Sequence, residues 1–194
     1  MNTSPDPKRA VTDHPILDIL ADRWSPRAWQ DRRVEDEKLR SVFEAARWAP
    51  SSENEQPWRF LIARRHVDEA WADLLASLRP GNQAWAAAAP VLALGVTRNT
   101  FTRNDRANAH ARHDLGLATA TLTAQAMALG LHVHPMGGIL PDEAGKRFEI
   151  PEEFDVVTGL AIGYLGDPDS LLEKYREGEV EPRTRRRLSG ALFT

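Results

Sequence analysis

Apolar residues follow two patterns along this chain, a helical repeat and short continuous runs. Helices are predicted where apolar residues recur every three or four positions, over residues 13–25, 36–48, 66–78, 114–129 and 141–148. Asp13 is the predicted cap of the first helix, and Gly130 is the predicted stop of the fourth. Strands are predicted from apolar runs, over residues 59–63, 91–96 and 156–164 and around His132 to His134.

Length and composition limit the kinds of protein this chain can be. At 194 residues it is expected to form a single domain over residues 1–194, in which residues 1–12 are polar and loosely held. A net charge of −3 gives no reason to expect nucleic acid or an anionic membrane as a partner. The chain has no cysteine, which excludes disulfides and thiolate ligands. No run resembles a signal peptide or a membrane span, so a cytoplasmic location is expected.

A polar loop between two prolines is the stretch that packing explains least. Residues 50–57 read PSSENEQP, and each proline restricts its own φ and the residue before it. Between the prolines lie four side chains with neutral donors and acceptors: Ser51, Ser52, Asn54 and Gln56. Such groups suit a ligand rich in hydroxyls, amides and carbonyls. The alternative is a capped turn, in which these side chains bind backbone groups only.

Two arginines flank a serine in the segment Arg23-Trp24-Ser25-Pro26-Arg27. A guanidinium presents a fixed fork of donors that a phosphate group can accept, and the hydroxyl adds another donor. In isolation, such a cluster is more typical of a solvated surface than of a binding site.

Four segments together resemble the nitroreductase family of FMN-dependent, dimeric oxidoreductases. Residues 49–58, APSSENEQPW, resemble the family's AP-S-x-N-x-QPW motif, and residues 23–27 stand where the family has an R-x-S-x-(R/K) element. Residues 135–138, PMGG, resemble its P-(I/M)-(E/G)-G segment, and residues 181–189, EPRTRRRLS, resemble its closing PR-x-R-x-PL segment. The matches occur in the family's order and cover nearly the whole chain.

The resemblance implies an α+β fold of three layers, with a central, mostly antiparallel sheet flanked by helices. It also implies an intertwined homodimer with two FMN sites at the interface, where the loop of residues 50–57 reaches the flavin held mainly by the other subunit. The helix over residues 114–129 carries small residues on several faces and is the expected dimer element. The implied cofactor-binding residues are Arg23, Trp24, Ser25, Arg27, Pro50, Ser51, Ser52, Asn54, Gln56, Asn82, Pro135, Met136, Gly137, Gly138, Arg183 and Arg185.

Within this set, the resemblance gives the phosphate end of FMN to Arg23 and Ser25 together with the tail arginines. Arg183 and Arg185 fit the family's register best, but Arg187 stands where the family has proline, so a slip of one residue stays open. By the resemblance, residues 183–194 form a tail that contributes to the phosphate site and to the dimer. As an isolated signal it would be a solvated basic tail.

The resemblance places other residues along the flavin ring. Arg27 would lie near the N1/O2 edge, and the amide of Gly137 would donate to N5. Glycine suits that position because a backbone without Cβ can come into contact with a flat ligand. Many members of the family have Asn-x-x-Lys where this chain has Asn82 and Trp85. Trp85 is therefore either a packing residue or a ring that stacks on a ligand, and the charge preference of the substrate is open.

His132 and His134 lie on one side of a predicted strand, where they could supply two ligands to a metal ion. No third ligand stands at a useful spacing, so a structural role is favoured and no metal is expected. Residues 100–112 are polar and rich in Arg and Asn without a period, and no role follows from their pattern.

By resemblance, the chain is predicted to be an NAD(P)H-dependent flavin oxidoreductase. Hydride would pass from NAD(P)H through flavin N5 to a small acceptor, such as a nitroaromatic or a quinone, in a ping-pong cycle. No G-x-G-x-x-G opens a helix after a strand, so the nicotinamide and the acceptor would use one pocket in turn. No side chain is required as acid, base or nucleophile. The alternatives are another reductive reaction on the same fold, such as enal or enone reduction or dehalogenation, and a non-catalytic flavin-binding protein.

Overall fold

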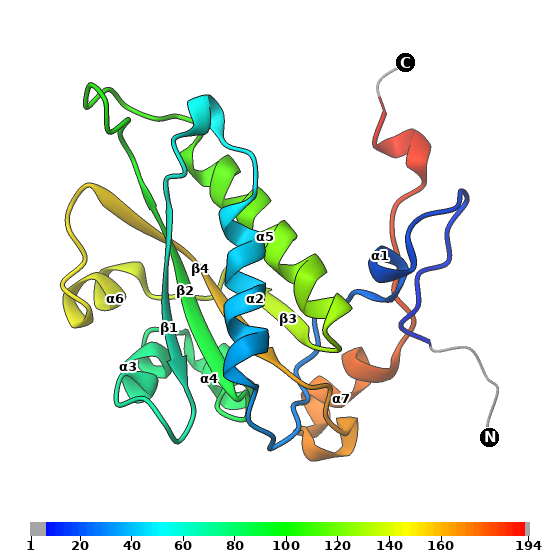
Figure 1. The fold of residues 1–194 in the computed structure, drawn as a ribbon. Helices are drawn as coiled ribbons and strands as arrows, with labels where there is room; N and C mark the ends of the chain where they lie inside the picture. Colours follow the sequence, from blue (N-terminus) through cyan, green and yellow to red (C-terminus); the bar gives the residue numbers. More distant parts are fainter. Residues whose placement is uncertain (1–6, 193–194) are drawn as a thin grey trace.

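The computed structural model describes residues 7–192, which fold into a sheet covered by helices (Figure 1). The helices of the described residues are α1 (Asp18–Asp22), α2 (Asp36–Arg47), α3 (Trp71–Ala76), α4 (Pro80–Ala86), α5 (Ala111–Ala128), α6 (Pro141–Arg147) and α7 (Glu173–Val180). The strands are β1 (Trp58–Arg64), β2 (Val91–Arg98), β3 (His132–Met136) and β4 (Phe154–Gly163). Three short 3₁₀ turns cover Ser52–Asn54, Pro168–Ser170 and Leu188–Gly190. No helix in the described part of the chain is both long and apolar enough to cross a bilayer.

The four strands form one antiparallel sheet in the order β1-β2-β4-β3. β2 and β4 occupy the centre, and all but the last residue of β2 are buried. A strand covered on both faces must be apolar at successive positions, because both sets of alternating side chains face helices. This explains the continuous apolar runs of β2 and β4 in the sequence.

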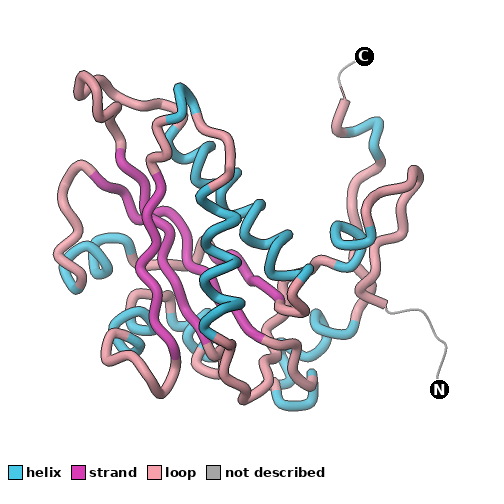
Figure 2. Tube along the Cα trace, viewed as in Figure 1, coloured by secondary structure: helices cyan, strands magenta, loops and turns pink. Residues whose placement is uncertain are grey.

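Helices cover both faces of the sheet, as Figure 2 shows. α2 and α5 pack on each other and on one face, where Val42 and Leu122 are fully buried. α3, α4 and α6 cover the opposite face with residues such as Leu74, Trp85 and Ala144. Burying one such leucine or valine contributes about 2 kcal/mol. The predicted α+β class, with an antiparallel sheet between helices, is confirmed.

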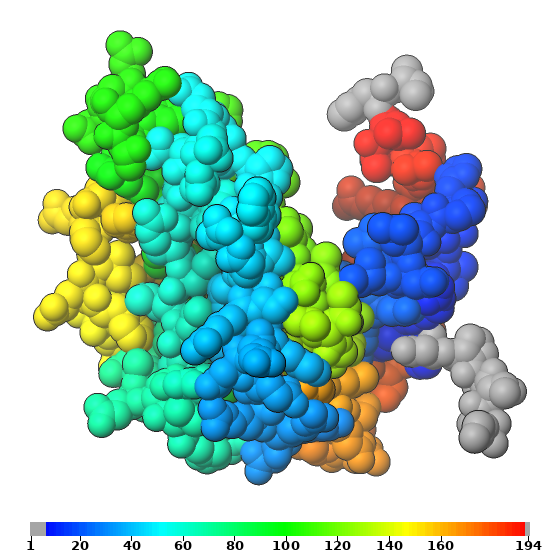
Figure 3. All heavy atoms as spheres, in the orientation of Figure 1, coloured from blue at the N-terminus to red at the C-terminus, as the bar shows by residue number. Residues whose placement is uncertain are grey.

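The N-terminal and C-terminal segments lie side by side on one flank of the molecule, beyond α5 (Figure 3). The Ala10 amide donates to the Ala21 carbonyl, and the Arg183 guanidinium donates to the carbonyls of Ala21 and Arg23. Of the segment 1–12 that was expected to be loosely held, only residues 7–12 are described. Within them, Lys8 is 6% exposed and donates to two carbonyls of the C-terminal part.

The first helix differs from its prediction. α1 covers only Asp18–Asp22, and its cap position is Leu17 rather than Asp13. Pro15 explains the late start, because a proline pushes the preceding residue out of the helical region. The predicted cap at Asp13 is therefore wrong.

The helix predicted over residues 66–78 is also wrong in its first turn. His66 has a φ of +63°, and the helix α3 begins only at Trp71. Asp68 accepts hydrogen bonds from the amide and the guanidinium of Arg64, and so stabilises a turn after β1 in place of a helix. Pro80 then begins α4, where its missing amide hydrogen costs nothing, and this helix was not predicted.

The remaining predicted elements are confirmed to within a few residues. α5 begins at Ala111, before the predicted start at Asp114, and residue Gly130 after its end has a φ of +74°. This left-handed conformation is the one expected of a helix-closing glycine. α7 was not predicted, because its sequence EKYREGEV has no apolar period.

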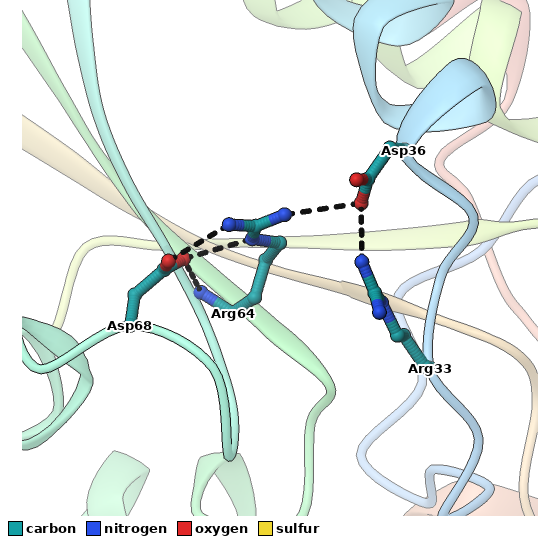
Figure 4. Close-up of polar contacts among 4 residues, drawn as sticks. All are labelled: Arg33, Asp36, Arg64 and Asp68. Carbon is teal, nitrogen blue, oxygen red and sulfur yellow. Dashed lines mark hydrogen bonds and ion pairs between the residues drawn. The ribbon is translucent and has the colours of Figure 1, made fainter.

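Four charged side chains connect the start of α2 with the end of β1 (Figure 4). Arg64 contacts Asp68 at 2.9 Å and Asp36 at 3.1 Å, and Arg33 contacts Asp36 at 2.9 Å. Hydrogen bonds from the Arg64 side chain and amide lower the pKa of Asp68 to about 2. Hydrogen bonds from Arg33 and Arg64 lower the pKa of Asp36 as well.

Replacing Asp68 with asparagine is expected to lower the thermal midpoint by roughly 2–4 °C at neutral pH, the usual scale for one good ion pair in a chain of this size. Because the folded pKa of Asp68 is depressed, the unfolded chain takes up the proton first as the pH falls. The stabilisation is thus complete above about pH 4 and is lost toward about pH 2, so the two midpoints should converge there. Thermal unfolding against pH measures this. The neighbouring exposed Glu69→Gln is the control, and a difference that stays constant down to pH 2 would contradict the prediction.

Candidate functional site

Basic side chains from both ends of the chain line one pocket on the flank beyond α5. The pocket has a volume of about 300 Å³, and its walls include Lys8, Arg23, Ser25, Arg183 and Arg185. Arg23 and Ser25 come from the chain just after α1, and the two later arginines come from the segment after α7. A larger hollow of about 450 Å³, lined by the N-terminal and C-terminal segments, shares the three arginines with it.

The three arginines of this pocket repel one another. Burial lowers the pKa of Arg23, and the positive charges of Arg183 and Arg185 lower it further. Within residues 7–192, neither Arg23 nor Arg185 forms an ion pair with a carboxylate. Like charges held close together cost free energy, and an anion bound among them lowers this cost.

The guanidinium groups have different local partners. Arg23 points its Nη1 toward Ser25 Oγ at 3.4 Å. Arg183 binds the carbonyls of Ala21 and Arg23, and so fixes the backbone that carries the first arginine. Trp24, which follows Arg23 in the sequence, is 8% exposed, and the Lys8 ammonium lies 4.8 Å from the centre of its ring.

The Arg27 guanidinium lies near the faces of two aromatic rings. Its guanidinium carbon is 6.0 Å from the Trp85 ring centre and 5.8 Å from that of Tyr175. Trp85 is 3% exposed and packs against the ring of His134 at 4.4 Å, so the packing role considered for this tryptophan is present. Trp85 thus forms a buried aromatic surface beside Arg27.

His134 is held as a neutral imidazole. Its Nδ1 lies 2.8 Å from the Pro26 carbonyl, which can only accept, so Nδ1 carries the hydrogen. Burial lowers the pKa of His134 to about 4, and the charges of Arg27 and Arg23 act in the same direction. Residues 7–192 contain no group of three or more acidic or histidine side chains that could hold a metal ion.

The neutral state of His134 predicts a pH dependence of stability. The unfolded chain binds this proton near pH 6.5 and the folded chain only near pH 4, so stability falls as the pH is lowered between these values. We expect a loss of about 1–2 kcal/mol from about pH 7 to about pH 5 that the variant His134→Phe lacks. Urea unfolding at both pH values measures it. The exposed His113→Asn should keep the loss, and an equal loss in His134→Phe would contradict the assignment.

The glycine segment follows β3 and is tied to α4. Asn82 Nδ2 donates to the Gly138 carbonyl at 3.0 Å, and a Cβ on Gly138 would lie 2.4 Å from that nitrogen. Gly137 is exposed, a Cβ added to it would meet nothing within 4 Å, and it borders a cavity of about 440 Å³. Of the two residues before it, Pro135 is exposed and Met136 is buried. The segment therefore offers an accessible backbone next to the Asn82 amide.

The proline-bounded loop is tightly folded. Ser51 Oγ accepts from the Gln56 amide, and the Gln56 side chain donates to Asn54. Three residues, Glu53, Asn54 and Gln56, have φ values of 51° to 56°. Such left-handed conformations in non-glycine residues cost free energy and persist where surrounding contacts hold them.

A buried carboxylate of α5 supplies one such contact. Asp114 is 2% exposed and accepts from the Ser52 amide at 3.0 Å. Pro50 and Asn54 are exposed, and Ser51 and Ser52 are partly so. The hydroxyl of Ser51 serves the capped-turn role considered for it, but this loop still presents polar groups to solvent.

Within the described part of the chain, the predicted site residues lie in separate groups. Arg23, Ser25, Arg183 and Arg185 share one pocket, whereas Asn82 and Gly138 meet through a hydrogen bond. The loop of residues 50–57 lies beyond the far end of α2 and contributes nothing to the arginine pocket (Figure 1). A single chain thus presents the loop and the pocket apart.

Sequence reasoning missed Lys8 and Glu179. Lys8 donates to the carbonyls of Gly178 and Glu181, at 2.8 Å and 2.6 Å. Glu179 is 2% exposed and accepts from two backbone amides of the Arg23–Ala28 segment. Both belong to charged stretches that resemble solvated surface, and Tyr175 and Val180 in the second stretch form no apolar repeat.

A family model described as the nitroreductase family matches residues 20–164. A crystal structure described as an oxidoreductase containing FMN is 36% identical and superposes with a TM-score of 0.90, covering 99% of this chain and 96% of that one.

Two curated proteins match over shorter stretches. The major NAD(P)H-flavin oxidoreductase of Aliivibrio fischeri is 29% identical over 94 residues, which are 47% of this chain and 43% of that protein. The nitrobenzene nitroreductase of Ectopseudomonas oleovorans is 43% identical over 47 residues, which are 24% of this chain and 21% of that protein. These alignments span less than half of each curated relative's length.

Proposed function

This chain belongs to the nitroreductase family, and on that premise we propose that it is an FMN-dependent oxidoreductase that takes hydride from NAD(P)H and passes it to a small acceptor. The observation that carries the proposal is the arginine pocket. Arg23, Arg183 and Arg185 converge on one space, and their mutual repulsion and burial lower the pKa of Arg23. The terminal phosphate of FMN is a dianion that such a pocket fits.

The donor set fits the rest of FMN as well. Arg23, Ser25, Arg183 and Arg185 would hold the phosphate, and the buried Trp24 would support them from behind. Pro135, Met136, Gly137 and Gly138 would run along the ring, with Asn82 at its pyrimidine edge. The open space around Gly137 supports this, because a flat ligand needs a wall without side chains.

Arg27 would supply positive charge at the N1/O2 edge of the ring. The two aromatic faces would restrain its guanidinium without neutralising it, since neither Trp85 nor Tyr175 carries a negative charge. The neutral His134 leaves Arg27 as the charged member of this group. A fixed cation that faces developing negative charge favours the reduction of the cofactor.

We further propose a homodimer in which each subunit completes the other's site. The separation of the loop from the arginine pocket within one chain supports it. Pro50, Ser51, Ser52, Asn54 and Gln56 would come from the partner subunit, and the Asp114 contact would keep their backbone in its strained form. The C-terminal arginines would remain with the phosphate of their own subunit.

FMN, when bound, supplies an N5 atom that accepts hydride from a nicotinamide and donates it to an acceptor. The residues of this chain supply binding, orientation and charge. The amide of the exposed residue Gly137 would donate a hydrogen bond to the ring, and no side chain would be required as an acid or base. The nicotinamide and the acceptor would enter the same pocket in turn, so the cycle is ping-pong.

Steady-state turnover tests this proposal. FMN-loaded protein is given NADH or NADPH with one acceptor at a time: a nitroaromatic, a quinone, an enone or a halogenated aromatic. Turnover of a nitroaromatic or quinone, with parallel double-reciprocal lines, is the expected result. Turnover of the enone or halide alone would replace the proposed acceptor, and bound FMN without any turnover would mean a flavin-binding protein.

A further inference from the structure

The short helix α7 contacts three separate segments in or next to the proposed flavin site. It has no motif, and seven of its eight residues are exposed or partly exposed. The exception is Glu179, which is 2% exposed although it is ionisable. A buried carboxylate is expensive unless its oxygens accept hydrogen bonds, so its position requires a reason.

Glu179 binds the backbone of the segment that carries the first site arginines. Its Oε1 accepts from the Arg27 amide at 2.7 Å and from the Ala28 amide at 2.8 Å. The contact spans 152 positions in the sequence. Two adjacent amides that point at one oxygen fix the local backbone direction, and with it the start of the Arg27 side chain.

The same helix contacts α4 and the N-terminal segment. Tyr175 donates from its hydroxyl to the Gly81 carbonyl at 2.8 Å, next to Asn82, while its ring faces Arg27. Lys8 donates to the Gly178 carbonyl and, beyond the helix, to that of Glu181. α7 therefore contacts the Arg27 segment, the residue before Asn82 and, through Lys8, the N-terminal segment.

We propose that Glu179 is a positioning residue for the FMN site: it acts through the backbone of Arg27 and Ala28 and touches no ligand itself. The inference rests on the proposed function, since it concerns affinity for FMN. Without the carboxylate, two amides lose their acceptor and the segment between Arg23 and Arg27 can rotate. The guanidinium groups would then meet the ligand from a broader set of directions.

The chemistry of the contact predicts which substitutions keep it. Both amides donate to Oε1, and Oε2 has no hydrogen-bond partner among the described residues. Glu179→Gln keeps an oxygen at the same reach and replaces the unpartnered oxygen by an amide group. Glu179→Asp keeps the charge but withdraws the carboxylate by one methylene. The reach of the acceptor, and not the charge, should therefore decide the outcome.

The test compares Glu179→Ala, Glu179→Gln and Glu179→Asp with Glu177→Ala, an exposed glutamate of the same helix. The dissociation constant for FMN is measured by quenching of flavin fluorescence. Hydrogen exchange of the Arg27 and Ala28 amides is measured in the apoprotein by NMR. The second readout does not depend on loading the enzyme, and Glu179→Asp and Glu179→Gln cover the case in which the alanine variant does not fold.

We expect the alanine and aspartate variants to bind FMN about tenfold more weakly or worse, because the two hydrogen bonds that hold the Arg27 and Ala28 backbone are lost. Exchange at Arg27 and Ala28 should be faster in both, and near wild type in the glutamine and Glu177→Ala variants, which should bind FMN normally. Faster exchange with unchanged FMN affinity would overturn the inference, as would a glutamine variant as weak as alanine. A wild-type protein that binds no FMN would instead refute the proposed function, and the inference with it.

Discussion

Replacing Arg23 with alanine is expected to weaken FMN binding by about tenfold to a hundredfold, the range for losing a charge-assisted contact with a phosphate. The same change should not destabilise the apoprotein. Burial and the charges of Arg183 and Arg185 already disfavour the Arg23 cation, so its removal relieves repulsion. We therefore predict that the affinity for FMN falls, whereas the stability of the apoprotein rises or stays the same.

Fluorescence quenching titrations with FMN and thermal unfolding of the apoprotein measure the two effects of Arg23→Ala. Arg40→Ala, which removes an exposed arginine of α2, is the matched control and should alter neither. If the Arg23→Ala variant binds FMN as tightly as wild type, Arg23 does not bind the phosphate of FMN. A large loss of apoprotein stability would show that Arg23 serves the fold.

The variant Gly166→Ala is expected to lose about 2–3 kcal/mol of folding free energy, the cost of forcing atoms into a filled space. A Cβ at this position would lie 2.4 to 2.6 Å from backbone atoms of Trp29, which cannot rotate away as a side chain could. The Gly166 amide also donates to the Ala28 carbonyl, and Trp29 forms a bridge with Leu165. The two segments must therefore separate.

Separation at Gly166 should also reach the flavin site, because Ala28 is adjacent to Arg27. Urea unfolding gives the free energy, and the thermal midpoint should fall by roughly 5–10 °C for a chain of this length. Gly145→Ala on α6 is the control, since its Cβ would meet nothing within 4 Å and alanine favours a helix. A Gly166→Ala variant as stable as the control would contradict the close backbone approach.

The local sequence pattern predicted those elements in which burial follows a regular pattern along the element. β2 and the second half of β4, from Gly159 to Gly163, are buried on both faces, so their apolar runs identify them directly. α2 has one face toward α5 and the sheet and shows the helical repeat. The start of α3 was missed because Asp68 forms a turn with Arg64, a competition that an apolar repeat does not reveal. α7 was missed because tertiary contacts, and not an apolar face, hold it.

The candidate site divides in the same way. The segments around Arg23, Asn54, Gly137 and Arg183 carry recognisable motifs, so resemblance pointed to them, and their roles remain proposals. Glu179 and Lys8 carry no motif, because each acts across more than 150 positions on backbone groups that any residue type presents. Only the folded chain brings such partners together.

The central claim is that the arginine pocket and the glycine segment hold an FMN that NAD(P)H can reduce. Protein reconstituted with FMN and freed of excess cofactor is titrated anaerobically with NADPH or NADH, while the visible absorption of the flavin is recorded. We predict that protein-bound FMN bleaches with one of the two donors and that its colour returns when a quinone or nitroaromatic is added. A chain that retains no FMN, or a bound FMN that neither donor bleaches, would contradict the account.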